Sequence, residues 1–146
     1  MNKVDLITNN YLFRDIAASD LSALARIAEE KDLMAGNLIY NAGQDSDAMF
    51  IIEMGTVDII PQGKQTPFAT MGSGQSLGEL AFFHPDKRVA SAVARERTQL
   101  VRIPFDKLAQ LVEERPAFGL IFYRNASMFL AKHVRGLALE RDHRYF

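Results

Sequence analysis

Short apolar runs separated by turn residues dominate the middle of the chain. The runs are Leu38-Ile39-Tyr40, Met49-Phe50-Ile51-Ile52, Val57-Asp58-Ile59-Ile60, Phe68-Ala69-Thr70-Met71, Ala90-Ser91-Ala92-Val93-Ala94 and Leu100-Val101-Arg102-Ile103. Glycine and proline stand at the joints, as in Pro61-Gln62-Gly63 and Gly72-Ser73-Gly74. Strands this short and this regularly spaced predict a β-barrel or β-sandwich over residues 33–104.

The apolar spacing becomes helical on both sides of this region. Residues 11–31 predict one or two short helices, with Ser19 placed to cap a helix that begins at Asp20. Residues 107–114 predict a short helix that Pro116 ends, and residues 117–139 predict a long one. We therefore expect one mainly β domain over residues 1–146, with N-terminal helices at 11–31, a barrel at 33–104 and C-terminal helices at 105–141.

The long helix carries two apolar stripes. One runs through Phe118, Phe122 and Phe129, and the other through Leu120, Tyr123, Leu130, Val134 and Leu137. A surface helix needs only one such stripe to pack on its own domain. We expect the second stripe to meet a second copy of the helix in a homodimer. The alternative is that both stripes fold onto the same barrel.

Composition excludes several classes of function. The 146 residues are the size of one domain, and a formal net charge of -1 gives no general attraction to DNA or to an anionic membrane. With no cysteine, disulfides, thiolate metal sites and a cysteine nucleophile are excluded. The sequence has neither a signal peptide nor an apolar run near the ~20 residues of a membrane span. We expect a cytoplasmic protein without a membrane or direct DNA partner, and residues 140–146 are too few for a helix-turn-helix.

Two glycines and a short helix form a candidate phosphate cradle. Gly74 and Gly78 permit backbone conformations that turn amides toward a ligand. Residues 79–83 contain no proline and can form a short helix, whose first amides lack intrahelical partners. The positive end of that helix would lie at Gly78, and such an end binds anions.

Arg88 and Glu79 extend this cradle toward a nucleotide. Arg88 follows a His84-Pro85-Asp86 turn, so the chain can bring its guanidinium back to the cradle, where the planar fork suits two phosphate oxygens. A carboxylate beside a phosphate would be repelled, so Glu79 makes sense as an acceptor for a neutral donor such as a sugar hydroxyl. A phosphate and a sugar hydroxyl together indicate a nucleotide.

These residues carry a family resemblance. Gly78-Glu79-Leu80-Ala81, followed by Arg88-Val89-Ala90-Ser91, resembles the phosphate-binding cassette of cyclic nucleotide-binding domains. The glycine-punctuated segments at residues 34–43 and 47–57 resemble the first strands of that family, and the resemblance covers roughly residues 12–116. It implies an eight-stranded, jelly-roll-like double-stranded β-helix barrel.

The resemblance also implies a ligand, cAMP or cGMP, and a set of contacts. The ligand-binding residues it implies are Gly78, Glu79, Leu80, Ala81, Arg88, Val89 and Ser91, with His133 and Val134 near the base. Ser91 either contacts the phosphate or faces the barrel interior as a strand residue, and Arg135 is an alternative stacking partner for the base. Valine at position 89 cannot hydrogen-bond to guanine as a threonine can, which favours cAMP.

The three histidines do not indicate a metal site. His84, His133 and His143 have no short spacing to one another, whereas barrel metalloenzymes need several ligands that converge on one ion. We therefore expect no metal and no enzymatic activity. By resemblance the protein is a sensor in which the nucleotide draws in the cassette and the long helix closes over the base, with an unknown downstream partner. The alternatives are an interaction or dimerisation domain without a physiological nucleotide, and a metal-dependent barrel enzyme.

Overall fold

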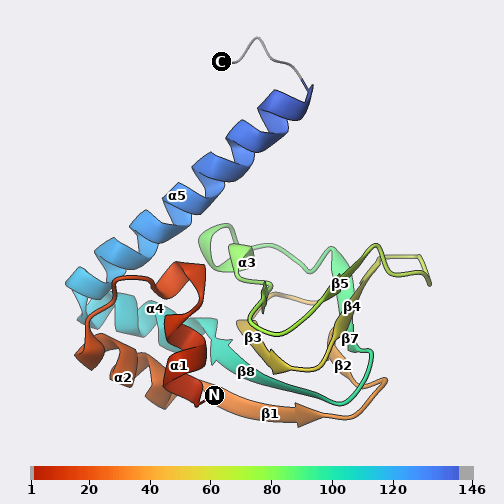
Figure 1. Ribbon diagram of the computed structural model, residues 1–146, viewed down its shortest axis with the longest axis horizontal. Helices are drawn as coiled ribbons and strands as arrows, with labels where there is room; N and C mark the ends of the chain where they lie inside the picture. The colour runs from red at the N-terminus through yellow and green to blue at the C-terminus, as the bar shows by residue number, and fades with distance from the viewer. Residues whose placement is uncertain (1, 142–146) are drawn as a thin grey trace.

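The computed structural model describes residues 2–141, and helices flank a β-rich middle region (Figure 1). In chain order the elements are α1 (Lys3–Thr8), the 3-10 helix η1 (Tyr11–Phe13), α2 (Ala18–Ile27), β1 (Glu29–Leu33), β2 (Leu38–Tyr40), β3 (Ala48–Met54), β4 (Val57–Pro61), β5 (Ala69–Met71), β6 (Ser76–Leu77), α3 (Leu80–Phe83), β7 (Ala90–Ala94), β8 (Thr98–Pro104), α4 (Phe105–Glu114) and α5 (Pro116–Arg141). The predicted class, mainly β with flanking helices, is confirmed.

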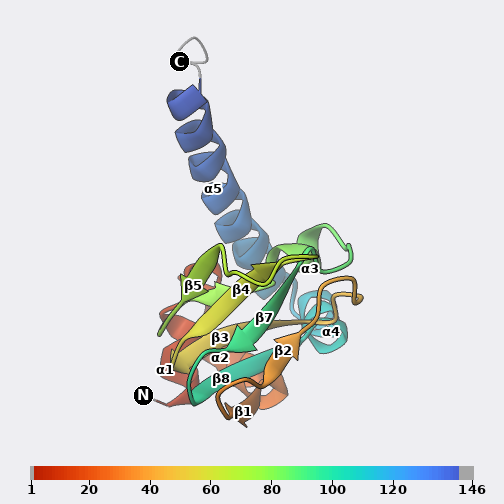
Figure 2. The ribbon, with the colours of Figure 1, turned by 90° about the vertical axis from the view of Figure 1, so that its right-hand side faces the viewer.

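The strands of the described residues form two antiparallel sheets of four. One sheet has the order β1-β8-β3-β6, and the other, which lies toward the viewer in Figure 2, has the order β2-β7-β4-β5. Buried residues alternate with half-buried ones along β7, as expected for a strand with one face on a core. The inner faces of the two sheets meet in a core that contains Phe50, Ile52, Val57 and Leu100.

A second core lies on the outer face of the β1-β8-β3-β6 sheet. Met49 and Ile51 of β3, with Val101 and Ile103 of β8, pack there against the helices. Because the side chains of β3 alternate between the two cores, residues 48–52 are all buried. The continuous apolar run in the sequence of β3 therefore reflects burial on both faces.

Helix α5 is attached to the domain by its first half. Phe118 and Phe122 are fully buried, and the ring centroid of Phe122 lies 5.5 Å from that of Phe13. Beyond these contacts α5 runs away from the sheets (Figures 1 and 2). The second stripe is exposed, with Leu120 at 74% and Val134 at 63%, so the alternative in which both stripes fold onto the same sheets is wrong. No helix in the described part of the chain has the length and apolar character needed to cross a bilayer.

The N-terminal helices differ from the predicted boundaries. Helix α1 lies before residue 11, and α2 begins at Ala18 with Ala17 as N-cap and no side-chain cap. Ser19 therefore lies within α2 and does not cap it. Asp20 lies in the first turn of α2, where negative charge is favoured, and pairs with Arg115 at 2.8 Å. The start of α2 thus has a tertiary ion pair in place of a side-chain cap.

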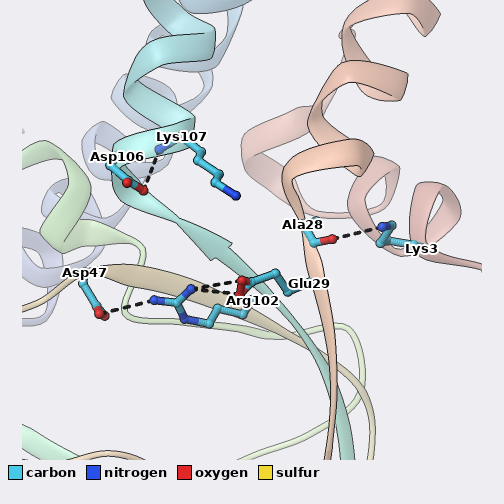
Figure 3. A network of polar contacts seen from close by, with 7 residues as sticks. All are labelled: Lys3, Ala28, Glu29, Asp47, Arg102, Asp106 and Lys107. Carbon is cyan, nitrogen blue, oxygen red and sulfur yellow. Dashed lines mark hydrogen bonds and ion pairs between the residues drawn. The ribbon is translucent and has the colours of Figure 1, made fainter.

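Strand β1 begins within the region that was expected to be helical: residues 29–31 were predicted as helix, and the barrel was expected to start at Leu33. Its sequence is charged, and it forms an edge of its sheet. Arg102 of β8 pairs with Glu29 at 3.0 Å and with Asp47 at 3.3 Å, and Figure 3 shows its guanidinium between the two carboxylates. Lys3 donates to the carbonyl of Ala28 just before the strand, at 3.0 Å. The edge strand β1 thus contacts β8 through a cross-strand charge pair, whereas the central strands carry apolar runs.

Candidate functional site

The segment that leads into α3 has the geometry of a turn followed by a helix start. Ser76 and Leu77 form β6 and pair with β3. Gly78 then adopts a φ of 72°, in the left-handed region that favours glycine. Glu79 is the N-cap of α3, so the predicted short helix is confirmed with its first turn at Leu80. The amides that open such a helix have no intrahelical acceptors.

Arg88 returns to this turn from the other side and is buried, with 6% of its surface exposed. Its Nη2 donates to the carbonyl of Ala48 at 2.6 Å, and its Nη1 donates to the carbonyl of Gly78 at 3.3 Å. The guanidinium carbon lies 4.2 Å from the ring centroid of Tyr40, which gives a cation–π contact. Arg88 is therefore held in place by the protein, and it is not a solvated loop charge.

The charge of Arg88 has no carboxylate partner in the described part of the chain. No ion pair to Arg88 occurs among the residues that the structure describes, and its Nε is buried without a hydrogen-bond acceptor. Burial lowers the pKa of Arg88 from its ordinary value, while Tyr40, Asp47 and Glu79 act in the opposite direction. A buried cation that is bonded only to carbonyls favours the approach of an anion.

A cavity of about 370 Å³ opens over this arginine. Its polar lining comes from the cassette and from Ser46, Ser76 and Lys87. The wall away from the cassette is apolar and includes Ile59, Phe68, Ala69 and Met71. Of the residues predicted to bind ligand, those that line the cavity are Gly78, Glu79, Leu80, Ala81, Arg88 and Val89.

Gly78 has a second reason to be glycine. A Cβ at this position would overlap Nη1 of Arg88 and lie 3.1 Å from its Cζ. The guanidinium cannot simply swing away, because Ala48 and Gly78 hold it by hydrogen bonds. The close approach of the arginine to the backbone therefore depends on the absence of a side chain at Gly78.

Glu79 accepts a hydrogen bond from within the protein. The hydroxyl of Tyr11 donates to its Oε1 at 3.0 Å. Tyr11 belongs to η1, so this bond joins the helical region to the cassette. The predicted role of Glu79, as acceptor for a sugar hydroxyl of the ligand, stays a prediction.

The remaining predicted residues lie outside the cavity lining. The hydroxyl of Ser91 donates to Oδ1 of Asn41 at 2.9 Å and accepts from the amide of Ala42 at 2.9 Å, so it supports the loop after β2. His133 lies on α5, with its ring centroid 4.2 Å from that of Phe129. Val134 is exposed on α5. Their contacts with a ligand stay predictions.

Two further positions that the sequence singles out are Val89 and His84. Val89 lines the cavity and is 80% exposed. His84 is the C-cap of α3. His143 lies outside the described residues. Within residues 2–141 no group of three or more His, Asp or Glu side chains has the geometry to hold a metal ion.

Three aromatic residues at the site were not predicted from the sequence. Tyr40 contacts the guanidinium of Arg88, Tyr11 donates to Glu79, and Phe68 is 69% exposed in the cavity wall. Phe68 and Tyr40 lie in runs that read as ordinary strands, and Tyr11 in a run that reads as helix. No local pattern distinguishes them from core residues.

A further cavity, of about 250 Å³, lies near Arg102. Lys31, Asp45 and Asp47 contribute charged side chains of both signs to its lining. Arg102 already pairs with Glu29 and Asp47. This region thus lacks the uncompensated positive charge that distinguishes Arg88.

Comparisons with known proteins agree with this geometry. The sequence profile described as "Cyclic nucleotide-binding domain" matches residues 30–115. The cAMP-dependent protein kinase regulatory subunit of Debaryomyces hansenii is 35% identical over 99 residues, which are 66% of this chain and 22% of that protein. The CRP-like cAMP-activated global transcriptional regulator of Mycobacterium tuberculosis is 26% identical over 115 residues, 77% of this chain and 51% of that protein.

The fold is also found among solved structures. The N-terminal domain of a transcriptional regulator from Streptomyces coelicolor superposes with a TM-score of 0.81 at 21% identity, covering 95% of this chain and 99% of that one. The chain spans about half or less of the two curated relatives described above. The matched profile covers more than half of the chain and includes both β6 and Arg88, so the protein belongs to the cyclic nucleotide-binding domain family.

Proposed function

We propose that this chain binds a cyclic nucleotide in the 370 Å³ cavity and acts as a regulatory module. The observation that carries the proposal is the buried guanidinium of Arg88, which has no carboxylate partner among residues 2–141 and lies under the turn that opens α3. A cyclic phosphate carries one negative charge and oxygens that accept from guanidinium and amide donors. The amides at Leu80 and Ala81 would supply the remaining donors.

The proposed ligand is cAMP in preference to cGMP. Phe68, Met71 and Val89 give the cavity apolar surfaces on which a purine can pack, and none of these side chains can hydrogen-bond to the additional groups of guanine. The two curated relatives described above are named for cAMP, which supports the same choice. Glu79 would accept from the 2′-hydroxyl of the ribose.

Ligand binding is proposed to change the position of α5. The cassette helix packs directly on it: the ring centroids of Phe82 and Phe122 lie 5.5 Å apart, as do those of Phe83 and Tyr123. A displacement of α3 toward the ligand therefore alters the surface on which α5 rests and biases its position. Such a movement, or the α5 of a second copy, is needed to bring His133 or Val134 to the base.

Titration calorimetry with cAMP, cGMP and linear 5′-AMP tests this function. We expect cAMP to bind most tightly. Arg88→Lys keeps a positive charge but loses the fork that reaches two acceptors, and should weaken cAMP binding by roughly tenfold or more. Arg97→Lys is the matched control, because Arg97 is exposed and pairs with Asp32 away from the cavity. Binding that is unaffected by Arg88→Lys would refute the assignment.

A second candidate function is an interaction or dimerisation domain that keeps the fold without a nucleotide. The specific observation in its favour is the exposed second stripe on α5, which includes Leu120, Val134 and Leu137. We propose that this stripe forms a homodimer interface in either case. Absence of binding by every nucleotide in the calorimetric series, with a stable dimer in solution, would favour this second function.

A further inference from the structure

The hydrogen bond between Tyr11 and Glu79 joins residues that are 68 positions apart in the chain. Tyr11 lies in the 3-10 helix η1, and Glu79 is the N-cap of the cassette helix. The donor and acceptor atoms are 3.0 Å apart. A hydrogen bond to an ionised acceptor is stronger than one between neutral groups, so this contact constrains the direction of the carboxylate.

The carboxylate of Glu79 can serve two donors at once. Tyr11 occupies Oε1, and Glu79 also lines the 370 Å³ cavity. An ionised carboxylate has about four acceptor positions on its two oxygens. Oε2 is therefore available to a donor in the cavity while Oε1 keeps its bond to Tyr11.

Tyr11 remains a donor at physiological pH. Its burial, together with the neighbouring charge of Glu79, raises the pKa of the Tyr11 hydroxyl well above its ordinary value. The hydroxyl is consequently protonated and can donate to the carboxylate throughout the neutral range.

The ring of Tyr11 is fastened to α5. It stacks on Phe129 with centroids 4.2 Å apart and an interplanar angle of 26°. The side-chain amide of Asn125, which is buried, donates to the carbonyls of Leu12 and Arg14, each at 2.9 Å. These contacts attach η1 to the middle of α5, so a movement of α5 relative to the sheets carries Tyr11 with it.

We propose that Tyr11 is a positioning residue that orients Glu79 toward the ribose 2′-hydroxyl and ties this orientation to the position of α5. The inference rests on the proposed nucleotide site and adds to it a residue outside the cavity lining. When α5 moves away from the cassette, the hydroxyl of Tyr11 leaves Oε1 and the carboxylate loses its fixed direction. Recognition of the ribose and the position of α5 therefore both depend on the hydrogen bond between Tyr11 and Glu79.

Tyr11→Phe removes the hydroxyl and keeps the stacked ring. We expect cAMP binding to weaken by about tenfold, since the lost bond is made to a charged group, while binding of 2′-deoxy-cAMP changes little. The readout is the dissociation constant of 2′-deoxy-cAMP divided by that of cAMP, both measured by titration calorimetry, and this ratio should fall in Tyr11→Phe. Tyr123→Phe is the matched control, because Tyr123 lies on α5 beside Phe83 and makes no side-chain hydrogen bond among the described residues.

A double-mutant cycle with Glu79→Gln separates positioning from a general structural effect. If Tyr11 acts through Glu79, then Tyr11→Phe should no longer change the ratio in the Glu79→Gln background. Phe129→Leu keeps the hydroxyl of Tyr11 but removes the ring on which Tyr11 stacks. This variant should also lower the preference for cAMP over 2′-deoxy-cAMP, as Tyr11→Phe does.

Four results would overturn the inference. Equal weakening of both ligands would give Tyr11 a structural role only, and tighter cAMP binding in Tyr11→Phe would make Tyr11 a competitor of the ribose. Additive effects in the cycle would place its action elsewhere than Glu79. If the wild-type protein binds neither ligand, the proposed function itself fails and the inference falls with it. The first three results leave that function intact.

Discussion

Replacement of Gly78 by alanine tests how tightly the turn and Arg88 are matched. The change has two costs. The backbone there has a φ of 72°, which an alanine adopts only with strain, and the new Cβ would overlap Nη1 of Arg88. Gly74 provides a matched control, because its φ is 85° but a Cβ there would meet no atom within 4 Å.

The two substitutions should differ by the cost of moving the guanidinium. The left-handed conformation costs about 1–2 kcal/mol in either variant. Gly78→Ala additionally disturbs the bonds from Arg88 to the carbonyls of Ala48 and Gly78, and bonds to a charged group contribute about 1.5–3 kcal/mol each. We therefore expect Gly74→Ala to lose about 1–2 kcal/mol of unfolding free energy, and Gly78→Ala, with one of the two bonds lost as well, about 2.5–5 kcal/mol.

Urea denaturation followed by circular dichroism measures both values, and calorimetry with cAMP measures the effect on the site. Gly78→Ala should weaken cAMP binding by more than tenfold, because the displaced arginine no longer holds its place under the turn. Gly74→Ala should weaken it little, because Gly74, although predicted as part of the cradle, does not line the cavity. Equal destabilisation of the two variants, with equal affinity for cAMP, would refute the steric match between Gly78 and Arg88.

Three other variants, one of them a double substitution, test the helical region. If α5 forms the proposed dimer, Leu130→Glu with Leu137→Glu should give a folded monomer, since like charges would meet across its two-fold axis. Sedimentation velocity should show no such change for the exposed control Met34→Glu, and an unchanged oligomer would contradict the proposed α5 interface. Asn125→Ala should lower the unfolding free energy by about 1–3 kcal/mol in urea denaturation, because the carbonyls of Leu12 and Arg14 lose their donor. An unchanged urea midpoint of unfolding would contradict the attachment of η1 to α5. Phe122→Ala should cost about 3–5 kcal/mol in the same assay, because its fully buried ring packs on Phe13, and a loss below 1 kcal/mol would contradict its place in the core.

The strands that bury apolar residues were predictable from the sequence. β3, β4, β7 and β8 each combine β-branched, aromatic or small apolar residues with glycine or proline nearby, and the structure has strands at these runs. The long C-terminal helix was likewise predictable from its spacing, and its first stripe, through Phe118 and Phe122, is buried as expected.

The elements that bury little apolar surface were not predictable in the same way. β1 is built of Glu29-Glu30-Lys31-Asp32-Leu33, and Arg102, which pairs with Glu29, lies 73 positions away. α2 starts at Ala18 without a side-chain cap, so the capping preference of Ser19 misplaces its start by two residues relative to the expected Asp20. Both segments make ion pairs with residues far away in the sequence, Glu29 with Arg102 and Asp20 with Arg115. The local sequence pattern does not predict such contacts.

The candidate site also has a part that was predictable from local residue types and a part that depends on contacts distant in the sequence. The turn at Gly78, the short helix after it and the return of Arg88 follow from local residue types, and the structure brings them together around one cavity. Arg88 donates to the carbonyl of Ala48, which is 40 positions away, and Glu79 accepts a hydrogen bond from Tyr11, 68 positions away. Contacts of this range leave no periodic trace in the sequence.

The most direct test of the central claim is to map the ligand onto the backbone by NMR. In a ¹⁵N–¹H spectrum of the 146-residue chain, addition of cAMP should shift the amides of Gly78, Leu80 and Ala81 and the Nε–H of Arg88 more than the amides of the strands. The amides around Arg102, at the second cavity, should change little. Shifts centred on Arg102, or no shift at Gly78 and Arg88 under saturating cAMP, would contradict the account.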